Sequence, residues 1–320
     1  MLVSVLLFLL GFVLLIKGGD WFVDAAASIA HRFHMPELLI GATVVSIGTT
    51  LPEVMVSAQG ALAGSGSIAF GNAIGSVICN TALIAAITIV AKPAAVERKT
   101  LVLPSAAFFI AAAFYCFNAY AFHSFSRLSG VVLLAMFALY MVITVMQMKR
   151  HPEASAQEDG DVQADAPGST LSHDVVMLIV GAAVIAVGAR LLVDNAQIIA
   201  AALGVPESVI ALTLVALGTS LPELVTAITS LLKGCGALSL GNIIGANLFN
   251  LVLVSGTAVT ISPFDLSTAS ATSLTVDIPL MLGVMAVMTV PALVRGRLSR
   301  WQGVVLLLSY AAYCAFLFVA

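Results

Sequence analysis

The chain has 320 residues, of which 61% are hydrophobic and only 9% are charged, and its mean hydropathy is +1.11. Soluble domains typically carry about 25% charged residues, so this composition excludes a soluble globular protein and indicates an integral membrane protein. The formal net charge is −3, and we expect membrane lipid, not nucleic acid or an obligatory protein, as the surroundings.

Apolar windows of about 20 residues, the length that crosses roughly 30 Å of hydrocarbon, recur along the whole chain. The predicted fold class is therefore an all-α polytopic membrane protein with about ten transmembrane helices. We read the first as a retained helix because Lys17 follows its apolar run instead of preceding it, unlike a secretory signal. The predicted spans are residues 1–17, 36–62, 68–91, 101–121, 127–149, 173–200, 206–233, 237–261, 274–294 and 301–319.

Loop charges predict the orientation. Of the 13 Lys and Arg residues, only Arg127 and Arg190 fall on one side when the connections alternate. By the positive-inside rule the other eleven face the cytoplasm, which places both termini outside the cytoplasmic (inner) membrane. The four cysteines show no pattern typical of a disulfide or zinc site and are expected to pack among apolar residues. They are Cys79, Cys116, Cys235 and Cys314.

An acidic segment at 150–172 divides the chain into halves at 1–149 and 173–320. Its composition is typical of a solvated cytoplasmic linker, and its carboxylates do not follow a calcium-loop pattern, although a regulatory calcium role is an alternative. Residues 41–80 recur at 211–250 with a constant offset of 170 and roughly 15 of about 40 positions identical. Because each half has an odd number of spans, equivalent helices run in opposite directions, the inverted-repeat plan of secondary transporters.

The repeated motif is a proline and a carboxylate in an apolar run, Gly48–Glu53 and Gly218–Glu223. A carboxylate at the centre of a membrane helix costs roughly 2.5 to 3.5 kcal/mol on insertion scales, so Glu53 and Glu223 are predicted to be functional. Each proline prevents one helical hydrogen bond and predicts a discontinuous helix with a freed carbonyl. Thr49 lies four residues before Glu53, on the same helix face.

The next helix of each half adds polar positions spaced by four. Asn72, Ser76 and Asn80 form a stripe, which Asn242, Ala246 and Asn250 repeat without the hydroxyl. Such an all-oxygen set suits a hard cation, and calcium takes 6 to 8 oxygen ligands. Two carboxylates balance one divalent ion, protons or more than one sodium, so exchange is expected and no resident cofactor.

Structural roles are the alternative for several polar residues. An isolated Asn or Ser in a membrane helix usually bonds a neighbouring helix, and hydroxyls beside a proline can cap broken helix ends. Arg190 and Asp194 are expected to pair, Asp24 lies either in a structural contact or in an access path, and Asp277 is expected at the interface.

At these residues the sequence resembles the calcium/cation antiporter superfamily, whose paired repeats carry G-[ST]-[ST]-x-P-E followed by G-N-x-x-G-[SA]-x-x-x-N. It is most similar to the prokaryotic, YrbG-type branch that has no large regulatory domain. The resemblance covers essentially the whole chain. It implies sodium-driven calcium exchange by alternating access, with a core of the second, third, seventh and eighth helices across which the first and sixth slide.

The resemblance also implies roles for single residues. The calcium-binding carboxylates match Glu53 and Glu223, with Thr49 and Thr219 as neighbouring ligands. The implied sodium ligands are Thr50, Ser220, Ser76, Asn80 and the backbone carbonyls of Ser46 and Ala216. The chain departs from the family at Asn250, where some members have Asp, and at Ala246, where a serine would match, so one flanking sodium site is expected to be weaker.

Other functions remain open at this point. A calcium/proton antiporter could use the same carboxylates, whereas Asn80 and Asn250 favour sodium. A cation channel fits the inverted repeat less well than a carrier. An intramembrane hydrolase would need a histidine or nucleophile at membrane depth, but the histidines lie at segment ends or in loops, so no enzyme is expected.

Overall fold

The computed structural model describes residues 2–64, 66–150, 170–203, 216–266 and 273–319, almost entirely as helices. Within these ranges nine helices are long and apolar enough to cross a membrane. Helices are expected because every backbone N–H and C=O inside a bilayer needs a partner in its own segment. The all-α polytopic fold is confirmed, while most of the acidic linker at 150–172 lies outside the described residues.

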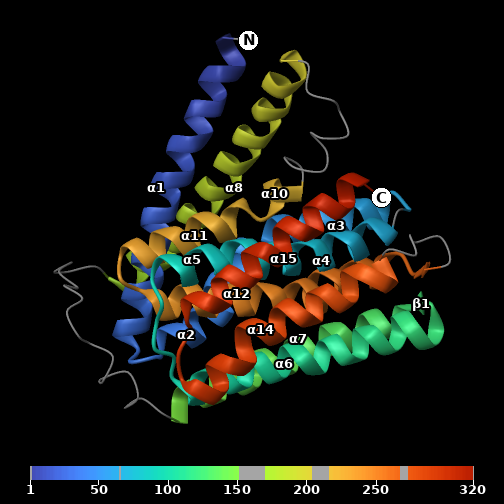
Figure 1. Ribbon diagram of the computed structural model, residues 1–320. Coiled ribbons are helices and arrows are strands. Elements are labelled where there is room, and N and C mark those ends of the chain that lie inside the picture. The colour runs from blue at the N-terminus through green and yellow to red at the C-terminus, as the bar shows by residue number, and fades with distance from the viewer. Residues whose placement is uncertain (1, 65, 151–169, 204–215, 267–272, 320) are drawn as a thin grey trace.

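The elements of the two halves follow one another with short connections (Figure 1). The first half contains α1 (Leu2–Arg32), α2 (Glu37–Ile40), η1 (Gly41–Val45), α3 (Ser46–Leu62), α4 (Gly66–Ile78), η2 (Cys79–Ala85), α5 (Ala86–Ala91), α6 (Arg98–Phe117), η3 (Asn118–Phe122), β1 (Ser124–Phe125) and α7 (Arg127–Arg150). The second contains α8 (Leu171–Ala202), α10 (Ala216–Thr219), α11 (Leu221–Leu232), α12 (Gly236–Phe249), η6 (Asn250–Val254), α13 (Ser255–Ile261), β2 (Phe264–Asp265), η8 (Ser273–Asp277), α14 (Ile278–Arg295) and α15 (Arg300–Val319). Segments labelled η are π-helical.

The first helix is longer than its apolar run predicts. We expect a span at 1–17, but α1 continues to Arg32, so Lys17 is an exposed residue inside the helix. Residues 18–32 contain no proline, and the glycines Gly18 and Gly19 lie against α8 and α11 without interrupting the helix. Lys17 therefore does not belong to a connecting loop, and the orientation rests on ten basic residues instead of eleven. The seventh predicted span, 206–233, is represented by α10 and α11, with 204–215 outside the described residues.

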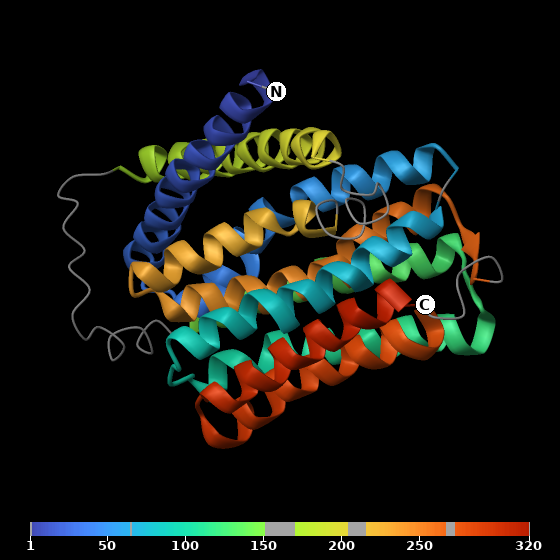
Figure 2. The same ribbon diagram turned by 45° about the horizontal axis from the view of Figure 1, so that its top comes forward.

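Helices α1 and α8 form a closely packed antiparallel pair that crosses the other helices obliquely (Figures 1 and 2). Small residues allow the approach: a Cβ on Gly18 would lie 2.9 Å from the Ile185 nitrogen, and one on Gly181 would lie 2.8 Å from the Phe22 nitrogen. At one end Asp174, only 3% exposed, accepts hydrogen bonds from Ser28 at 2.8 Å and Arg32 at 3.3 Å. The pair is thus held together along its length.

The centre of the molecule is formed by the third and eighth spans, Phe70–Ala91 and Gly236–Ile261. Their central windows are 78% and 89% buried, against 22% for Leu171–Ala202 in the outer pair. Each is preceded by a tight turn at a repeat-related glycine, Gly64 with φ of 81° and Gly234 with φ of 84°. Glycine is required there because other residues adopt positive φ only at a steric cost. The turns produce matching helical hairpins, α3–α4 and α11–α12.

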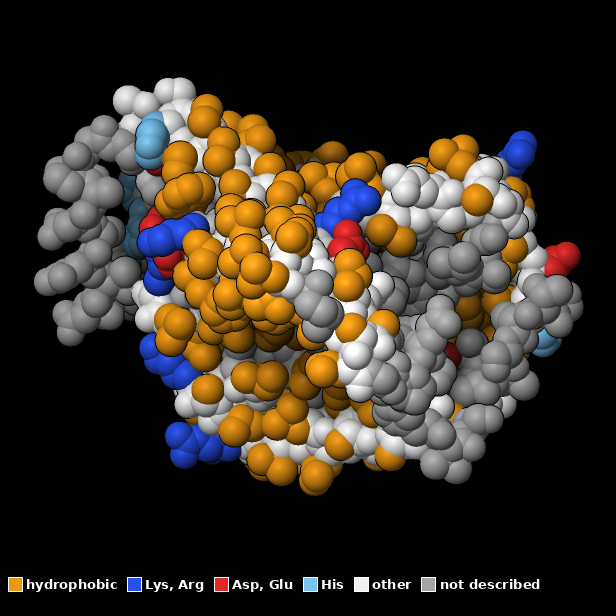
Figure 3. Space-filling view, turned by 90° about the horizontal axis from the view of Figure 1, so that it is seen from above, with side chains coloured by type: hydrophobic (Ala, Val, Ile, Leu, Met, Phe, Trp, Pro, Cys, Tyr) orange, Lys and Arg blue, Asp and Glu red, His pale blue; other side chains and the backbone are white. Residues whose placement is uncertain are grey.

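The two ends of the bundle differ in chemistry. Most Lys and Arg residues lie at the end where α5, α11 and α14 finish, which we call the basic end, and Figure 3 shows Lys and Arg gathered towards one edge of an otherwise hydrophobic face. At the opposite end Ser124 and Phe125 pair with Asp265 and Phe264 in a two-stranded antiparallel sheet. Rings of Phe70, Tyr115, Phe125 and Phe264 stack beneath it.

Candidate functional site

Two acidic side chains lie deep inside the helical bundle. Glu53 is in the middle of α3 and Glu223 is in the first turn of α11, and both are 0% exposed. Helices α3 and α11 are in contact, and the two carboxylates are close enough to interact electrostatically. The fold therefore brings together two carboxylates that stand 170 residues apart in the sequence, one from each repeated motif.

Many polar atoms around this pair have no protein partner. Among the described residues, sixteen buried side-chain nitrogen or oxygen atoms make no hydrogen bond, and ten of them belong to six predicted ligands. These six are Thr50, Glu53, Asn80, Ser220, Glu223 and Asn250. An unsatisfied buried polar atom costs about 1–3 kcal/mol, so such a concentration needs a reason beyond packing. Binding of a cation by the oxygen atoms among them would supply that reason.

Thr49 links the first-half motif to the second half. Its hydroxyl donates to Asn242 Oδ1 at 3.2 Å and lies beside the Glu223 carboxylate, although no well-aligned hydrogen bond joins them. The Ser46 hydroxyl donates to the carbonyls of Gly41 at 2.7 Å and Asn242 at 3.0 Å. The Ser46 carbonyl, a predicted ligand, accepts a long 3.5 Å bond from the Thr49 hydroxyl.

The remaining predicted ligands lie on elements that surround the pair. Ser76 is 3% exposed on α4, one turn before Asn80, and Ala246 is fully buried at the matching position of α12. Ala216 begins the short helix α10 and the half-buried Thr219 ends it. Because α10 contacts α4, the second-half backbone there lies against the helix that carries Ser76.

The predicted helix break occurs in one half only. Ser220 interrupts the second-half helix with φ −89° and ψ 3°, and Pro222 sits in the first turn of α11, where a missing N–H costs nothing. In the first half, α3 runs continuously through Pro52. A proline inside a helix removes a single hydrogen bond, and the bonds on either side keep α3 intact. The prediction of two discontinuous helices is therefore wrong for the first half.

Three π-helical segments adjoin the site, and the sequence gives no signal for them. Segment η1 ends directly before Ser46, Asn80 is the second residue of η2, and Asn250 begins η6. The last two are related by the repeat. The Ser255 hydroxyl bonds the Asn250 carbonyl at 3.1 Å, one of the contacts that accommodates the wider turn. Single π turns inside α-helices frequently mark functional sites.

Two further contacts beside Asn80 could not be predicted from the spacing of residues in the sequence. The Cys79 thiol lies beside the Ser220 hydroxyl and accepts a weak 4.0 Å hydrogen bond from Tyr310. Asn247 donates to the Thr81 hydroxyl at 2.7 Å and so connects α12 to η2. Both contacts join residues adjacent to Asn80 with the second half. They are recognisable only once the helices are placed in space.

The predicted ligand side chains around the acidic pair offer carboxylate, amide and hydroxyl oxygens. Within the described ranges, no three His, Cys, Asp or Glu side chains gather into a cluster that could hold a metal. A cation between Glu53 and Glu223 would take its other ligands from amide, hydroxyl and carbonyl oxygens. Those are ligands that a hard ion such as calcium accepts.

The ion pair predicted on α8 is confirmed. Arg190 and Asp194 approach to 3.6 Å, both largely exposed, so the pair contributes little to stability. Asp277 precedes α14 and accepts a 3.0 Å hydrogen bond from Tyr313. Asp24 forms a 2.6 Å ion pair with Lys233 of α11, which places it at the basic end.

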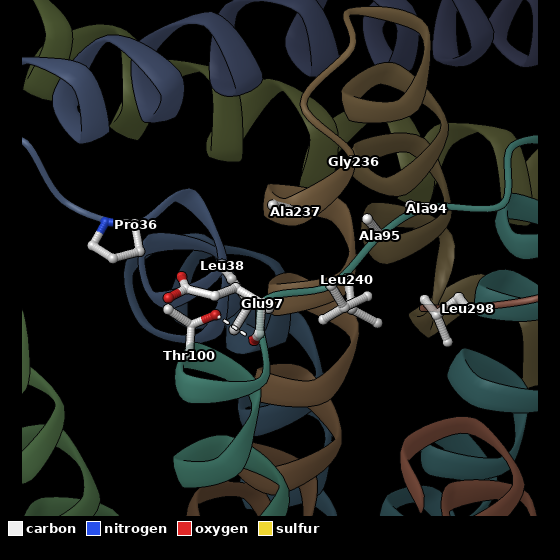
Figure 4. A pocket seen from close by; sticks show the side chains of 11 residues that line it. Pro36, Leu38, Ala94, Ala95, Glu97, Thr100, Gly236, Ala237, Leu240 and Leu298 are labelled. Atoms are coloured by element: carbon white, nitrogen blue, oxygen red, sulfur yellow. Dashed lines mark hydrogen bonds between the residues drawn. The ribbon is translucent and has the colours of Figure 1, made fainter. Parts of the chain in front are cut away.

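A small pocket at the basic end is lined by neither Glu53 nor Glu223 (Figure 4). Leu38, Glu97, Leu240 and Leu298 are among its lining residues, and the Thr100 hydroxyl donates to the Glu97 carbonyl at 2.9 Å beside it. Its volume of about 30 Å³ leaves room for about one water molecule. None of the predicted ligands lines this pocket.

Together the fold and the buried pair define a multi-pass helical membrane protein with an oxygen-rich acidic centre. The pattern of the family described as "Sodium/calcium exchanger protein" matches residues 3–146 and 173–319. The chain belongs to this sodium/calcium exchanger family.

Individual relatives and solved structures agree with the family. The chain is 30% identical to the sodium/calcium exchanger MaX1 of Methanosarcina acetivorans, covering 99% of both, and 35% identical to the inner membrane protein YrbG of Escherichia coli, covering 82% and 81%. Structures of the sodium-calcium exchanger NCX_Mj match 98% of both chains at 32% identity, with a TM-score of 0.79. The resemblance to the calcium/cation antiporters is confirmed: the protein is a transmembrane cation antiporter and not an enzyme.

Proposed function

We propose that the protein exchanges sodium for calcium across the cytoplasmic membrane by alternating access. The observation that carries the proposal is the meeting of Glu53 and Glu223, one from each half, both fully buried, with many oxygen atoms that have no hydrogen-bond partner among the described residues. Two negative charges are balanced by one calcium ion or by two or more sodium ions. The two negative charges must be neutralised by bound cations before the site can change its access through a low-dielectric region. Release of one ion therefore requires binding of the other, which couples their transport.

The proposed calcium ligands are Glu53, Glu223, Thr49 and Thr219. The proposed sodium ligands are Thr50, Ser220, Ser76, Asn80, Asn250 and the carbonyls of Ser46 and Ala216. With Asn250 neutral and Ala246 lacking a hydroxyl, the eighth-span side of the site offers less to sodium than the third-span side. NCX_Mj is described as carrying out extracellular ion exchange with induced occlusion of its binding site, which supports the same kind of mechanism here.

Alternating access requires that one end opens while the other closes. In this structure α12 packs tightly on η1 and α2 at the basic end, where Gly41 and Gly241 remove any side chain from the contact. We infer that the basic end is cytoplasmic, with both termini outside, because its connections hold most of the Lys and Arg residues. Movement of the α1–α8 pair across the core is the proposed way of changing access.

Transport by the purified protein in lipid vesicles tests this function. Uptake of labelled calcium is expected when sodium is loaded inside and diluted outside, and is expected to stop when a sodium ionophore collapses the gradient. A pH gradient alone is the second arm. Uptake that follows the pH gradient and ignores sodium would replace the proposal with calcium/proton exchange, and no uptake under either gradient would contradict both.

A further inference from the structure

Helix α11 carries unpaired polar side chains beyond the acidic centre. Thr226 and Ser230 follow Glu223 by three and seven residues, which places all three on one helix face. Both hydroxyls are fully buried, and neither has a hydrogen-bond partner among the described residues. Ser220, on the same face before Glu223, is buried and unpaired as well. A stripe of unsatisfied oxygen atoms therefore extends from the site along α11.

Other hydroxyls in the same molecule are satisfied in the ordinary way. A Ser or Thr in a membrane helix can donate to the carbonyl four residues earlier. Thr43, Thr144, Thr260, Thr289 and Ser309 all do so, at 2.6 to 2.9 Å. Thr226 and Ser230 do not, although they lie inside a regular helix. Their repeat partners are Val56 and Gly60, so the stripe is not required by the repeated fold.

The stripe has the length of half a membrane. At 1.5 Å per residue, Ser230 lies about 10 Å along the helix from Glu223, and Lys233 about 15 Å. The hydrocarbon core is about 30 Å thick, so these residues lead from its middle to its surface. Their end point is the basic end of the bundle.

Carboxylates gather where the stripe ends. Lys233 pairs with Asp24 at 2.6 Å and with Asp20 at 3.5 Å, and Glu37 lies close enough to Cys235 to hydrogen bond it. Two acids on one lysine give a local excess of negative charge at an end where the connections are otherwise basic. Such an excess raises the local concentration of cations.

Helix α1 packs on the face of α11 next to the stripe, through Val225 and Thr229. A Cβ on Gly19 would lie 2.7 Å from Val225 and 3.0 Å from the Thr229 hydroxyl, so the two backbones are close. Asp20 and Asp24 come from the same helix. Because α1 is packed along α8 and bonded to Lys233, displacement of the pair would separate Asp20 and Asp24 from α11 and expose the flank of the stripe.

We propose that Thr226 and Ser230, followed by Asp20 and Asp24, line the route along which cations pass between the buried site and the basic end. The proposal rests on the exchange function above. In the conformation described here the route is closed, and its hydroxyls are desolvated without partners. When it opens, the hydroxyl oxygens replace part of the hydration shell of a passing sodium or calcium ion.

Isosteric variants test the route. Thr226→Val and Ser230→Ala remove one oxygen each while keeping the shape. Each is expected to slow sodium-driven calcium uptake in vesicles about tenfold, the rate equivalent of one lost polar contact. Calcium affinity and thermal stability should not fall, because the hydroxyls stabilise nothing in this conformation. Thr144→Val, which removes an equally buried but paired hydroxyl from α7, is the matched control and should transport normally.

Two results would overturn the route: wild-type rates in both variants, or loss of stability that parallels the loss of transport. A second measurement does not depend on the identity of the cargo. In a chain whose native cysteines are replaced, Ser230→Cys should react with a small cationic thiol reagent added at the basic end and not at the other. Absence of this labelling contradicts the route, whereas a wild-type protein that moves no calcium contradicts the exchange function instead.

Discussion

The hairpins α3–α4 and α11–α12 have closely related sequences and different surroundings. Asn242 of α12 holds the hydroxyls of Ser46 and Thr49 in the opposite half. Its repeat partner Asn72 turns instead to Ser57 within its own hairpin, at 2.9 Å. Asn242 thus bonds to the other half, whereas Asn72 bonds within its own half.

Glycines show the same difference. Added Cβ atoms on Gly241 and Gly245 would collide with the backbone of Leu38 and Ala42, whereas those on Gly71 and Gly75 would meet no atom of the described residues within 4 Å. The two halves therefore meet backbone to backbone at these two glycines of the basic end. Inverted repeats that adopt two conformations at once are what alternating access requires. The predictions below test this asymmetry.

The largest effect is expected where the halves should be equal. Glu53→Gln and Glu223→Gln each remove one of two negative charges that share a cation. Removing the carboxylate from a buried pair of carboxylate and cation costs about 3–5 kcal/mol. Each variant should reduce sodium-driven calcium uptake at least about a hundredfold. Thermal unfolding in detergent should show an intact fold, since an amide keeps the shape. Near-normal transport by either variant would remove that carboxylate from the site.

Glycine variants should separate the halves by stability. Gly241→Ala places a methyl group against the Leu38 carbonyl, and overpacking of this kind costs about 1–3 kcal/mol. A Cβ on Gly71 would meet none of the described residues within 4 Å, and alanine is the better helix former by about 0.5–1 kcal/mol. The melting temperature should fall for the first and hold or rise for the second. Equal shifts would show that the two contacts are alike.

The asparagines should differ by coupling. Asn242→Ala leaves the Thr49 and Ser46 hydroxyls without this partner, at a cost of about 1–2 kcal/mol, and should couple to Thr49→Val in a double-mutant cycle. Asn72→Ala loses one bond to Ser57 and should be additive with Thr49→Val. Free energies of unfolding measure both cycles. Coupling of Asn72 to Thr49 would place the two hairpins in equivalent states.

The smallest effect is expected from restoring symmetry. Ala246→Ser supplies the hydroxyl that Ser76 has in the first half, and one added ligand of about 1 kcal/mol strengthens sodium binding roughly fivefold. The sodium concentration for half-maximal calcium uptake should fall by about that factor. Ser76→Ala is the paired control and should raise it. No change in either variant would exclude both positions from the sodium ligands.

Much of the fold could be predicted because lipid restricts the choices. Apolar length alone locates nearly every span, and the gap-free repeat by itself pairs Glu53 with Glu223. The apolar run underestimates the length of α1, because residues Lys17, Asp20 and Asp24 follow it and the chain remains helical there. Asp20 and Asp24 are tolerated because they pair with Lys233 of α11, a contact that a hydropathy window does not register.

The parts that sequence could not predict depend on three-dimensional contacts. Pro52 and Pro222 are equivalent in the motif, but only the second stands at a helix start. The π turns at Asn80 and Asn250 follow no local pattern. Thr226 and Ser230 look like ordinary helix hydroxyls until their missing hydrogen bonds are known. In each case the distinguishing property is a partner, present or absent, on another turn or helix.

The length of the outer helices gives the bilayer itself an influence on this antiporter. Helices of 31 and 32 residues extend about 46 and 48 Å, well beyond a hydrocarbon thickness of about 30 Å. Such helices fit only by leaning, and the angle at which they lean follows the thickness of the lipid. Lipids with longer or shorter acyl chains should therefore favour different positions of α1 and α8 and change the turnover rate without altering a single ligand.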